Sequence, residues 1–319
     1  MKTIMINDSG QTPMTKFSYL ITVFVVILLF GQYSKSFAQG YTEAVSYSSD
    51  FMPMKIADPN GNQTFSGNDF RFSAFAPVFL NNYKSQYLLI GGNFEALHFW
   101  GTHPDLDVNG VYSISPTFGY VAALSKSFTL SELLIPLLNS DFNNIKGSDI
   151  HFGAIIRGDY LVNSKLAFRV TMGYRYQFYG PQYLALIGID WKISNKWRFY
   201  GDAPSNANLN YKICEKINTG FNLTANNTSY GLDHDRYLKY NTIEPGLYME
   251  YGFCKNWAIR GTAAYSVQRN LEIYNKDDKV DGVVDFINIG TKPTPLNLAV
   301  SNGPSFKMAI SYRIADQEK

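Results

Sequence analysis

Long segments of this chain alternate apolar and polar residues with a period of two, the spacing of side chains on the two faces of a β-strand. The longest runs from Trp257 to Ile273, and others cover Leu166–Phe178, Thr242–Phe253 and Phe306–Ile314. Strands of soluble sheets usually have about 5 to 6 residues, whereas a strand that crosses a bilayer at a tilt needs about 9 to 11. The length of these segments therefore favours membrane-spanning strands.

Further segments of the same kind bring the expected number of strands to about fourteen. They lie near Tyr41–Phe51, Phe70–Leu80, Gln86–Phe99, Val111–Leu124, Phe128–Leu138, Ile150–Leu161, Tyr183–Ile193, Trp197–Asp202, Asn206–Ile213 and Ile217–Ala225. An even number suits an antiparallel barrel made from a single chain. Pro204 separates two short arms between Trp197 and Ile213; if these form one bent strand or an inward excursion, the count becomes about twelve.

Short and long connections between the predicted strands alternate along the chain. Short turns are expected at Asn81–Ser85, Ser125–Ser127, Asn163–Lys165, Ser194–Lys196, Cys214–Lys216 and Lys255–Asn256, and longer loops at Pro53–Asp69, Gly101–Gly110, Asn139–Asp149, Tyr230–Lys239 and Tyr274–Asn302. Outer-membrane barrels have this asymmetry, because their periplasmic turns are short and their extracellular loops are long. Both ends of the strand-forming region fall on the short-turn side.

The two faces of the predicted strands differ in a way that separates a membrane barrel from a soluble one. One face is apolar, for example at Phe168, Tyr174, Val267, Leu271 and Ile273, and the opposite face carries ionisable residues of both signs. A soluble sandwich would bury the apolar face, whereas a closed membrane barrel turns it to lipid and keeps the polar face inside. We therefore predict an all-β fold, an antiparallel up-and-down transmembrane β-barrel.

The first 38 residues have the features of a secretory signal peptide. Lys16 precedes an apolar run from Phe17 to Phe30, and small residues around Ala38 offer a cleavage point before Gln39. We expect a signal peptide at residues 1–38, cut after Ala38, and a barrel domain at 39–319. An uncleaved anchor is the alternative, although the apolar run is shorter than the ~20 residues of a spanning helix. Met14 is an alternative start of the chain.

Composition supports the same class of protein. Aromatic residues make up 16% of the chain, which suits the aromatic belts of a membrane barrel, and Trp191, Trp197 and Trp257 flank short turns that would lie at one interface. The formal net charge of +2 leaves no basic field for a nucleic acid partner. The two cysteines, Cys214 and Cys254, follow strand-like segments on the same side of the sheet, so one disulfide and two free thiols both remain open.

One region carries a resemblance to a known family. The segment from Trp191 to Phe199 is followed by Pro204 and then by Leu209-Asn210-Tyr211-Lys212-Ile213. With the signal peptide and the strand pattern, the chain resembles a family of outer-membrane β-barrel proteins of Gram-negative bacteria, and is distantly similar to transport barrels for fatty acids and aromatic compounds. The resemblance implies location and fold and no activity. The chain departs from it by lacking a terminal aromatic residue and a long N-terminal plug.

Catalytic chemistry has little support in the sequence. The four histidines are His98, His103, His151 and His234, and no serine with a recognisable nucleophile context accompanies them. A lipid hydrolase of the outer membrane, with His98 and His234 as candidates, is therefore our third hypothesis only. We expect no enzyme activity, no cofactor and no metal site.

The ionisable residues of the polar faces are the remaining candidates for function. In our leading hypothesis the barrel is a passive pore or transport channel for small solutes, because charged side chains that line a pore set its selectivity. The predicted lumen-lining residues are Arg157, Arg169, Arg175, Arg198, Glu244, Glu250, Arg260 and Glu272. The alternative is a non-conducting structural or surface-interaction barrel. Expected partners are outer-membrane lipid and small solutes; the sequence does not give the oligomeric state.

Overall fold

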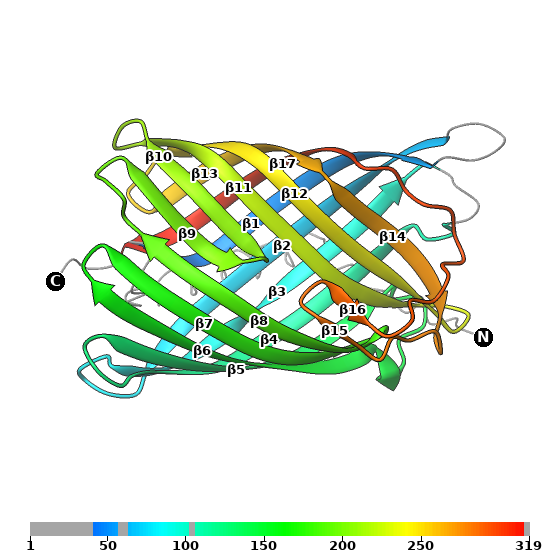
Figure 1. Ribbon diagram of the computed structural model, residues 1–319, viewed down its shortest axis with the longest axis horizontal. Coiled ribbons are helices and arrows are strands. Elements are labelled where there is room, and N and C mark those ends of the chain that lie inside the picture. The colour runs from blue at the N-terminus through cyan, green and yellow to red at the C-terminus, as the bar shows by residue number, and fades with distance from the viewer. Residues whose placement is uncertain (1–40, 57–62, 102–105, 316–319) are drawn as a thin grey trace, which may run out of the picture.

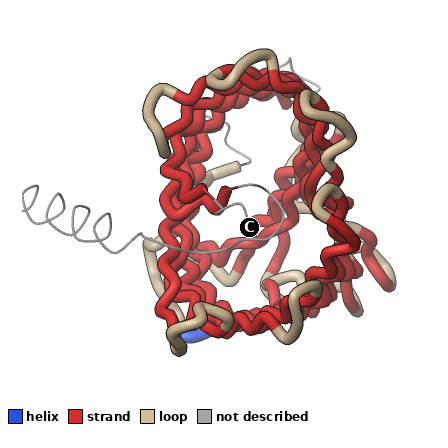
Figure 2. The backbone as a smooth tube through the Cα atoms, turned by 90° about the vertical axis from the view of Figure 1, so that its left-hand side faces the viewer, coloured by secondary structure: helices blue, strands red, loops and turns tan. Residues whose placement is uncertain are grey.

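The fold is a closed β-barrel. The computed structural model describes residues 41–56, 63–101 and 106–315, and within them the chain forms an antiparallel barrel of fourteen wall strands (Figures 1 and 2). The predicted fold class and strand count are therefore confirmed. Strand β1 (Tyr41–Ile56) closes the ring, because it pairs with both β2 (Gln63–Phe79) and β17 (Gly303–Ala315). The predicted signal peptide lies outside the described residues.

The remaining elements follow one another around the barrel in sequence order. They are β3 (Gln86–Trp100), β4 (Gly110–Ala123), β5 (Phe128–Ser140), the 3₁₀ turn η1 (Gly147–Asp149), β6 (Ile150–Asn163), β7 (Leu166–Gln177), β8 (Gly180–Trp191), β9 (Trp197–Ala203), β10 (Asn206–Lys212), β11 (Ile217–Leu232), β12 (Arg236–Gly252), β13 (Trp257–Ser266), β14 (Gln268–Asn275), β15 (Gly282–Val284) and β16 (Ile287–Ile289). Strands β13 and β14 together make one wall strand. Strands β15 and β16 form a small hairpin within the connection from β14 to β17.

The two ends of the barrel differ as the sequence predicts. Short turns close one end, the short-turn end, where β1 starts and β17 finishes; most of the longer connections lie at the opposite, long-loop end (Figure 1). The predicted loop Tyr230–Lys239 is wrong. β11 and β12 continue pairing, with Tyr230 opposite Leu238, and only the three residues 233–235 separate the strands.

The apolar faces of the strands point outward. Phe168, Tyr174 and Val267 are 44%, 43% and 52% exposed, whereas the alternate residues Arg169 and Thr171 are buried. An exterior this apolar needs a hydrocarbon environment, and an interior with ionisable groups needs water or charged partners. The predicted assignment of the two faces therefore holds for these strands.

A one-residue insertion changes the face of the wall strand formed by β13 and β14. Gly246 of β12 lies opposite Ala264, but Ile243, three residues earlier, lies opposite Gln268, four residues later. The extra residue reverses the side chains that follow it. Leu271 and Ile273 are only 1% exposed, so their predicted place on the lipid face is wrong: both point into the barrel.

Strands β9 and β10 are too short to complete the wall at the long-loop end. Each has seven residues, and the turn at Pro204 ends them beside the middle of β8 (Figure 1). Farther up, β15 takes the place of β9 by pairing in parallel with Gln182 and Tyr183 of β8. The carboxylate of Asp285 accepts a hydrogen bond of 2.9 Å from the backbone N–H of Ala185. The β15–β16 hairpin therefore fills part of the missing wall.

The described residues settle two further points from the sequence. Cys214 and Cys254 are free, exposed thiols. Within residues 41–56, 63–101 and 106–315, no helix has the length and apolarity to cross a membrane.

Candidate functional site

The lumen near the short-turn end contains a first group of ion pairs on β6 to β9. The guanidinium of Arg169 contacts Asp159 at 2.7 Å and Asp202 at 3.0 Å, and Arg157 contacts Asp159 at 3.0 Å. Arg198 pairs with Asp190 at 2.7 Å. Three predicted lumen residues, Arg157, Arg169 and Arg198, thus lie on the polar side of this wall, each with an acidic partner on the same or a nearby strand.

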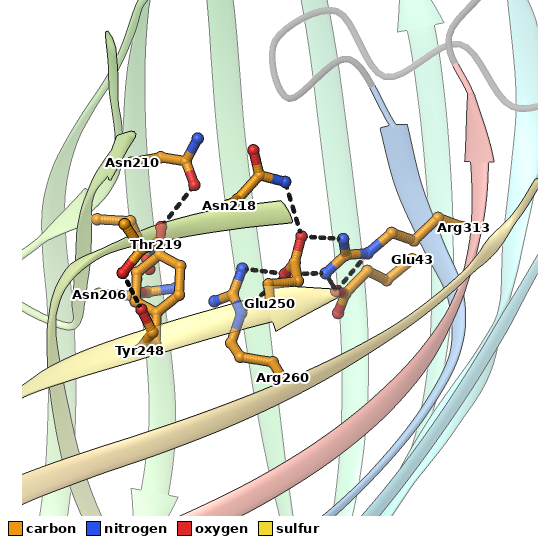
Figure 3. Close-up of polar contacts among 10 residues, drawn as sticks. Glu43, Asn206, Asn210, Asn218, Thr219, Tyr248, Glu250, Arg260 and Arg313 are labelled. Atoms are coloured by element: carbon orange, nitrogen blue, oxygen red, sulfur yellow. Dashed lines mark hydrogen bonds and ion pairs between the residues drawn. The ribbon is translucent and has the colours of Figure 1, made fainter. Parts of the chain in front are cut away.

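A second network lies across the strands that close the barrel. The carboxylate of Glu250 contacts Arg260 at 2.7 Å and Arg313 at 2.6 Å, and Arg313 also contacts Glu43 at 3.1 Å (Figure 3). The guanidinium of Arg260 is 4.3 Å from the ring centre of Tyr248. The structure therefore brings the predicted residues Glu250 and Arg260 together. Arg313, the second basic partner of Glu250, was not in the predicted set.

The other three predicted residues have different surroundings. Arg175 donates to the side chain of Gln182 at 2.6 Å and to the backbone carbonyl of Asn227. Glu244 accepts from the hydroxyl of Ser266 and lies 4.0 Å from Arg269. Glu272 lies toward the long-loop end and pairs at 2.7 Å with Lys292 of the β14–β17 connection. Glu272 therefore does not belong to the network of Glu250 and Arg260.

A third charged group, absent from our predicted set, lies farther into the lumen. Arg71 contacts Asp69 at 2.6 Å and Glu95 at 3.2 Å, and the hydroxyl of Tyr230 donates to Glu95 at 3.0 Å. Lys307 of β17 lies opposite Asp50 of β1 in the sheet. The sequence does indicate that these residues face the lumen, because they alternate with the outward-facing Phe70, Phe72 and Phe306 on their strands.

Above these charges, toward the long-loop end, the lumen is filled by an apolar plug. Fifteen buried residues form it, each no more than 8% exposed. They are Met52, Met54, Ile56, Phe65, Leu97, Phe99, Leu106, Val111, Tyr230, Leu232, Leu238, Tyr240, Leu271, Ile273 and Val300. Side chains packed at the density of a protein interior leave little room for water between them.

The upper half of the β11–β12 hairpin is buried on both of its faces, although β12 still pairs there with β14 of the wall. One face of β11 supplies Tyr230 to the plug, while Ser229 on the other face hydrogen-bonds to Gln177 of β7 at 2.8 Å. Gly231 even pairs with Ser140 of β5, a strand that is distant around the ring. We call residues 227–241 the inward hairpin.

Ionic contacts at the surface hold the tip of the inward hairpin. Asp235 contacts Lys146 of the β5–β6 connection at 3.1 Å and Lys276 at 3.8 Å. The hydrogen bond from Lys146 lowers the pKa of Asp235 and raises the pKa of the Lys146 ammonium. These groups are exposed, so the contact is weak, and it persists until acid protonates the carboxylate.

The three histidines of the described residues lie on different elements: His98 on β3, His151 on β6 and His234 between β11 and β12. His98 packs edge-on against Tyr112, and His234 lies in the β11–β12 turn at φ 60°. His103 lies outside the described residues. Among residues 41–56, 63–101 and 106–315, no three His, Cys, Asp or Glu side chains are grouped so that they could hold a metal ion.

The closed wall, the apolar exterior and the charged interior together define the class of this protein. Every wall strand pairs on both sides for at least part of its length, so the barrel has no continuous open edge, and the side chains that face outward are apolar. Only a closed barrel or a helix satisfies its backbone hydrogen bonds in lipid. The chain is a transmembrane antiparallel β-barrel.

The chain matches one known family over most of its length. The family model described as a domain of unknown function, DUF6268, matches residues 37–280, and the chain belongs to this family. No curated protein matches the chain.

Solved structures that resemble the chain include outer-membrane channels. The COG4313 outer membrane channel from Pseudomonas putida F1 is 7% identical, with a TM-score of 0.43 over 88% of this chain and 99% of that one. The Pseudomonas putida toluene transporter TodX is 8% identical, with a TM-score of 0.41 over 90% and 96%. The NanC porin is 9% identical, with a TM-score of 0.38 over 84% and 100%.

A charged substitution on the outer face tests the lipid contact. Met172 is 59% exposed in the middle of β7, so Met172→Arg would be nearly neutral in water. In a bilayer we expect it to destabilise the barrel by about 2 to 4 kcal/mol, measured by urea unfolding in lipid vesicles. Ser164→Arg, in the exposed β6–β7 turn, is the matched control with little effect. Equal stability of the two variants would contradict a lipid-facing β7.

Proposed function

We propose that the protein is a gated outer-membrane channel for small polar solutes, closed in this structure by the inward hairpin. One observation carries the proposal: the polar, partly exposed lumen ends at a plug that a single β-hairpin helps to build. The side chains of Arg157, Arg198 and Asp202 are 32%, 26% and 24% exposed, so water reaches the lumen up to these charges. In outer-membrane barrels the short-turn end faces the periplasm.

The position of the inward hairpin suits a movable element. On the β11 side, pairing with β10 stops at Thr224, below the inward hairpin. Beyond that residue, contact with the opposite wall includes hydrogen bonds such as Asn139 to Ser229 (2.9 Å), one bridge to Ser140 and stacking of Phe178 on Tyr237. Displacing the hairpin would break these contacts, and β14, which pairs with β12 from Arg236 to Ile243, would move with it.

The packed plug also favours a second function. A barrel whose lumen stays filled would be a non-conducting structural barrel that presents its long loops at the surface. The same buried residues support both functions. The two functions differ in whether the plug leaves the lumen. Conductance of a variant without the plug hairpin separates them.

Shortening the inward hairpin is the experiment that tests the channel. Asn227 and Asn241 are paired, so residues 228–240 can be replaced by an Asn-Gly turn that keeps the strand register. This change removes four plug residues: Tyr230, Leu232, Leu238 and Tyr240. In planar bilayers we expect stable single-channel conductance from the shortened variant and conductance near background from the wild type.

The control for this experiment changes only the turn. Replacing residues 233–235 by Asn-Gly keeps both strands and the plug, so this variant should stay closed. Folding of each variant is checked by the change in gel migration on heating. A folded, shortened variant that remains at background conductance would overturn the channel and leave the non-conducting barrel.

A further inference from the structure

A polar cleft lies inside the barrel between the plug and the network of Glu250, Arg260 and Arg313. Its volume is about 310 Å³, and β1, β10 to β13 and β17 supply most of its lining. At about 30 Å³ for each water, this is room for roughly ten water molecules. Tyr240 belongs to both the plug and the cleft lining, and Arg313 lies in both the cleft lining and the ionic network. A small solute in this cleft would therefore sit directly below the closed plug.

The charges that line the cleft cancel. Four acidic residues (Glu43, Asp50, Asp69 and Glu244) are matched by four basic ones (Arg71, Arg260, Lys307 and Arg313). Several are already paired, including Asp69 with Arg71 at 2.6 Å and Glu43 with Arg313 at 3.1 Å. An anionic or a cationic solute would have to compete with these pairs and with those that Glu250 makes with Arg260 and Arg313. The lining therefore suits a neutral solute better than a charged one.

Most of the remaining lining consists of hydroxyl and amide side chains. Ser46, Asn206, Asn222, Thr224, Asn226 and Thr262 are examples. The buried Oδ1 of Asn222 and the buried Nδ2 of Asn226 have no hydrogen-bond partner within the described residues. One atom is an acceptor and the other a donor, and rotation of the terminal amide presents either to the cleft. A solute hydroxyl satisfies both kinds of atom, since it donates and accepts.

Aromatic surface completes the lining. Tyr200 and Tyr240 both border the cleft and offer apolar ring faces among the polar groups. A ring that carries hydroxyls at its edge and C–H groups on its faces matches this mixture, whereas a plain hydrocarbon would leave the amides unpaired.

From these observations we propose that the cleft binds a neutral polyhydroxylated solute, a sugar or polyol about the size of one or two hexose rings. This inference rests on the proposed channel function. It specifies the class of solute that the channel would carry. Asn222, Thr224 and Asn226 are the positioning residues, and hydrogen bonds to solute hydroxyls supply most of the specificity.

Calorimetric titration of the purified protein in detergent micelles tests the proposal. Glucose and maltose are the neutral probes, and glucuronate and glucosamine are charged analogues of the same size. We expect the neutral sugars to bind at least tenfold more tightly than either charged analogue. Equal affinity for the charged analogues, or no heat from the neutral sugars, overturns the proposal.

Variants locate the site. Asn222→Leu removes an amide from the cleft, and Thr224→Val removes a hydroxyl while keeping the side-chain shape, so it remains informative if the first variant does not fold. Each should weaken sugar binding about tenfold, the equivalent of one hydrogen bond worth about 1.4 kcal/mol. Asn195→Leu, in an exposed short turn, should bind as the wild type does. Unchanged binding in the two cleft variants would overturn the assignment to this cleft.

The titration and the conductance measurement test different proposals, and either can be contradicted without the other. Binding is measured with the hairpin in place, so it needs no open channel. Conductance of the shortened variant without sugar binding to the intact protein would sustain the channel and overturn the sugar assignment. Sugar binding with a non-conducting shortened variant would do the reverse.

Discussion

Replacing Arg269 by methionine is expected to lower the free energy of unfolding by about 3 to 5 kcal/mol. The side chain of Arg269 is fully buried where β13 passes into β14. It donates to the carbonyl of Pro53 at 2.9 Å and to that of Pro304 at 3.0 Å, and so ties β14 to β1 and β17. Methionine fills much of the volume but leaves these carbonyls, and the carboxylate of Glu244, without a cation. Urea unfolding in lipid vesicles measures the loss.

Arg236→Met is the matched control for this prediction. Arg236 is partly exposed and lies 3.9 Å from Asp107, whose side chain is 77% exposed. A surface pair of this kind contributes about 0 to 1 kcal/mol. If the two variants differed in stability by less than about 1 kcal/mol, the hydrogen bonds of Arg269 would not stabilise the junction between β13 and β14.

The periodic pattern of the sequence predicts the barrel because lipid imposes it on every strand. Residues such as Phe168 and Tyr174 must face hydrocarbon, and the alternation follows from the pleat. Pro204 marks the β9–β10 turn correctly, since proline lacks the N–H that a central strand needs. The number and order of the wall strands were therefore predictable from the sequence.

The reversal of faces after Ser266 was not predictable from the same pattern. Ile259, Tyr265, Leu271 and Ile273 keep a period of two in the sequence, so the alternation gives no sign of an extra residue. The insertion at Val267 is fixed by what β14 must contact: the plug on the inside and Lys292 of the last connection on the outside. Only the tertiary arrangement decides between the two registers.

The plug is visible in the sequence as a change in the residues of the inward face. On β1 the inward face changes from Ser48 and Asp50 to Met52 and Met54 toward the long-loop end, and on β3 it changes from Glu95 to Leu97. An apolar inner face has no function in a water-filled lumen. Such a change on neighbouring strands predicts that something apolar enters the barrel at that height.

Tyr230 lies where the plug meets the charges of the lumen, and its substitution is expected to loosen the closed state. Tyr230→Ala removes a fully buried ring and the hydroxyl that donates to Glu95, a loss of about 3 to 5 kcal/mol. Each 1.4 kcal/mol corresponds to a tenfold change in an equilibrium. If the plug and the gate are the same structure, the open fraction in planar bilayers should rise about a hundredfold or more, through a loss of more than about 2.8 kcal/mol.

Conservative variants separate the ring from the hydroxyl. Tyr230→Phe keeps the packing but leaves the buried Glu95 carboxylate without this donor, a loss of about 1.5 to 3 kcal/mol. Tyr237→Phe on the other side of the hairpin removes a hydroxyl whose acceptor is the neutral carbonyl of Asp278, so its effect should be nearer 1 kcal/mol. The expected order of open fractions is therefore Tyr230→Ala, Tyr230→Phe, Tyr237→Phe and wild type. Tyr230 variants that unfold more readily yet never conduct would show that the hairpin stabilises the barrel without gating it.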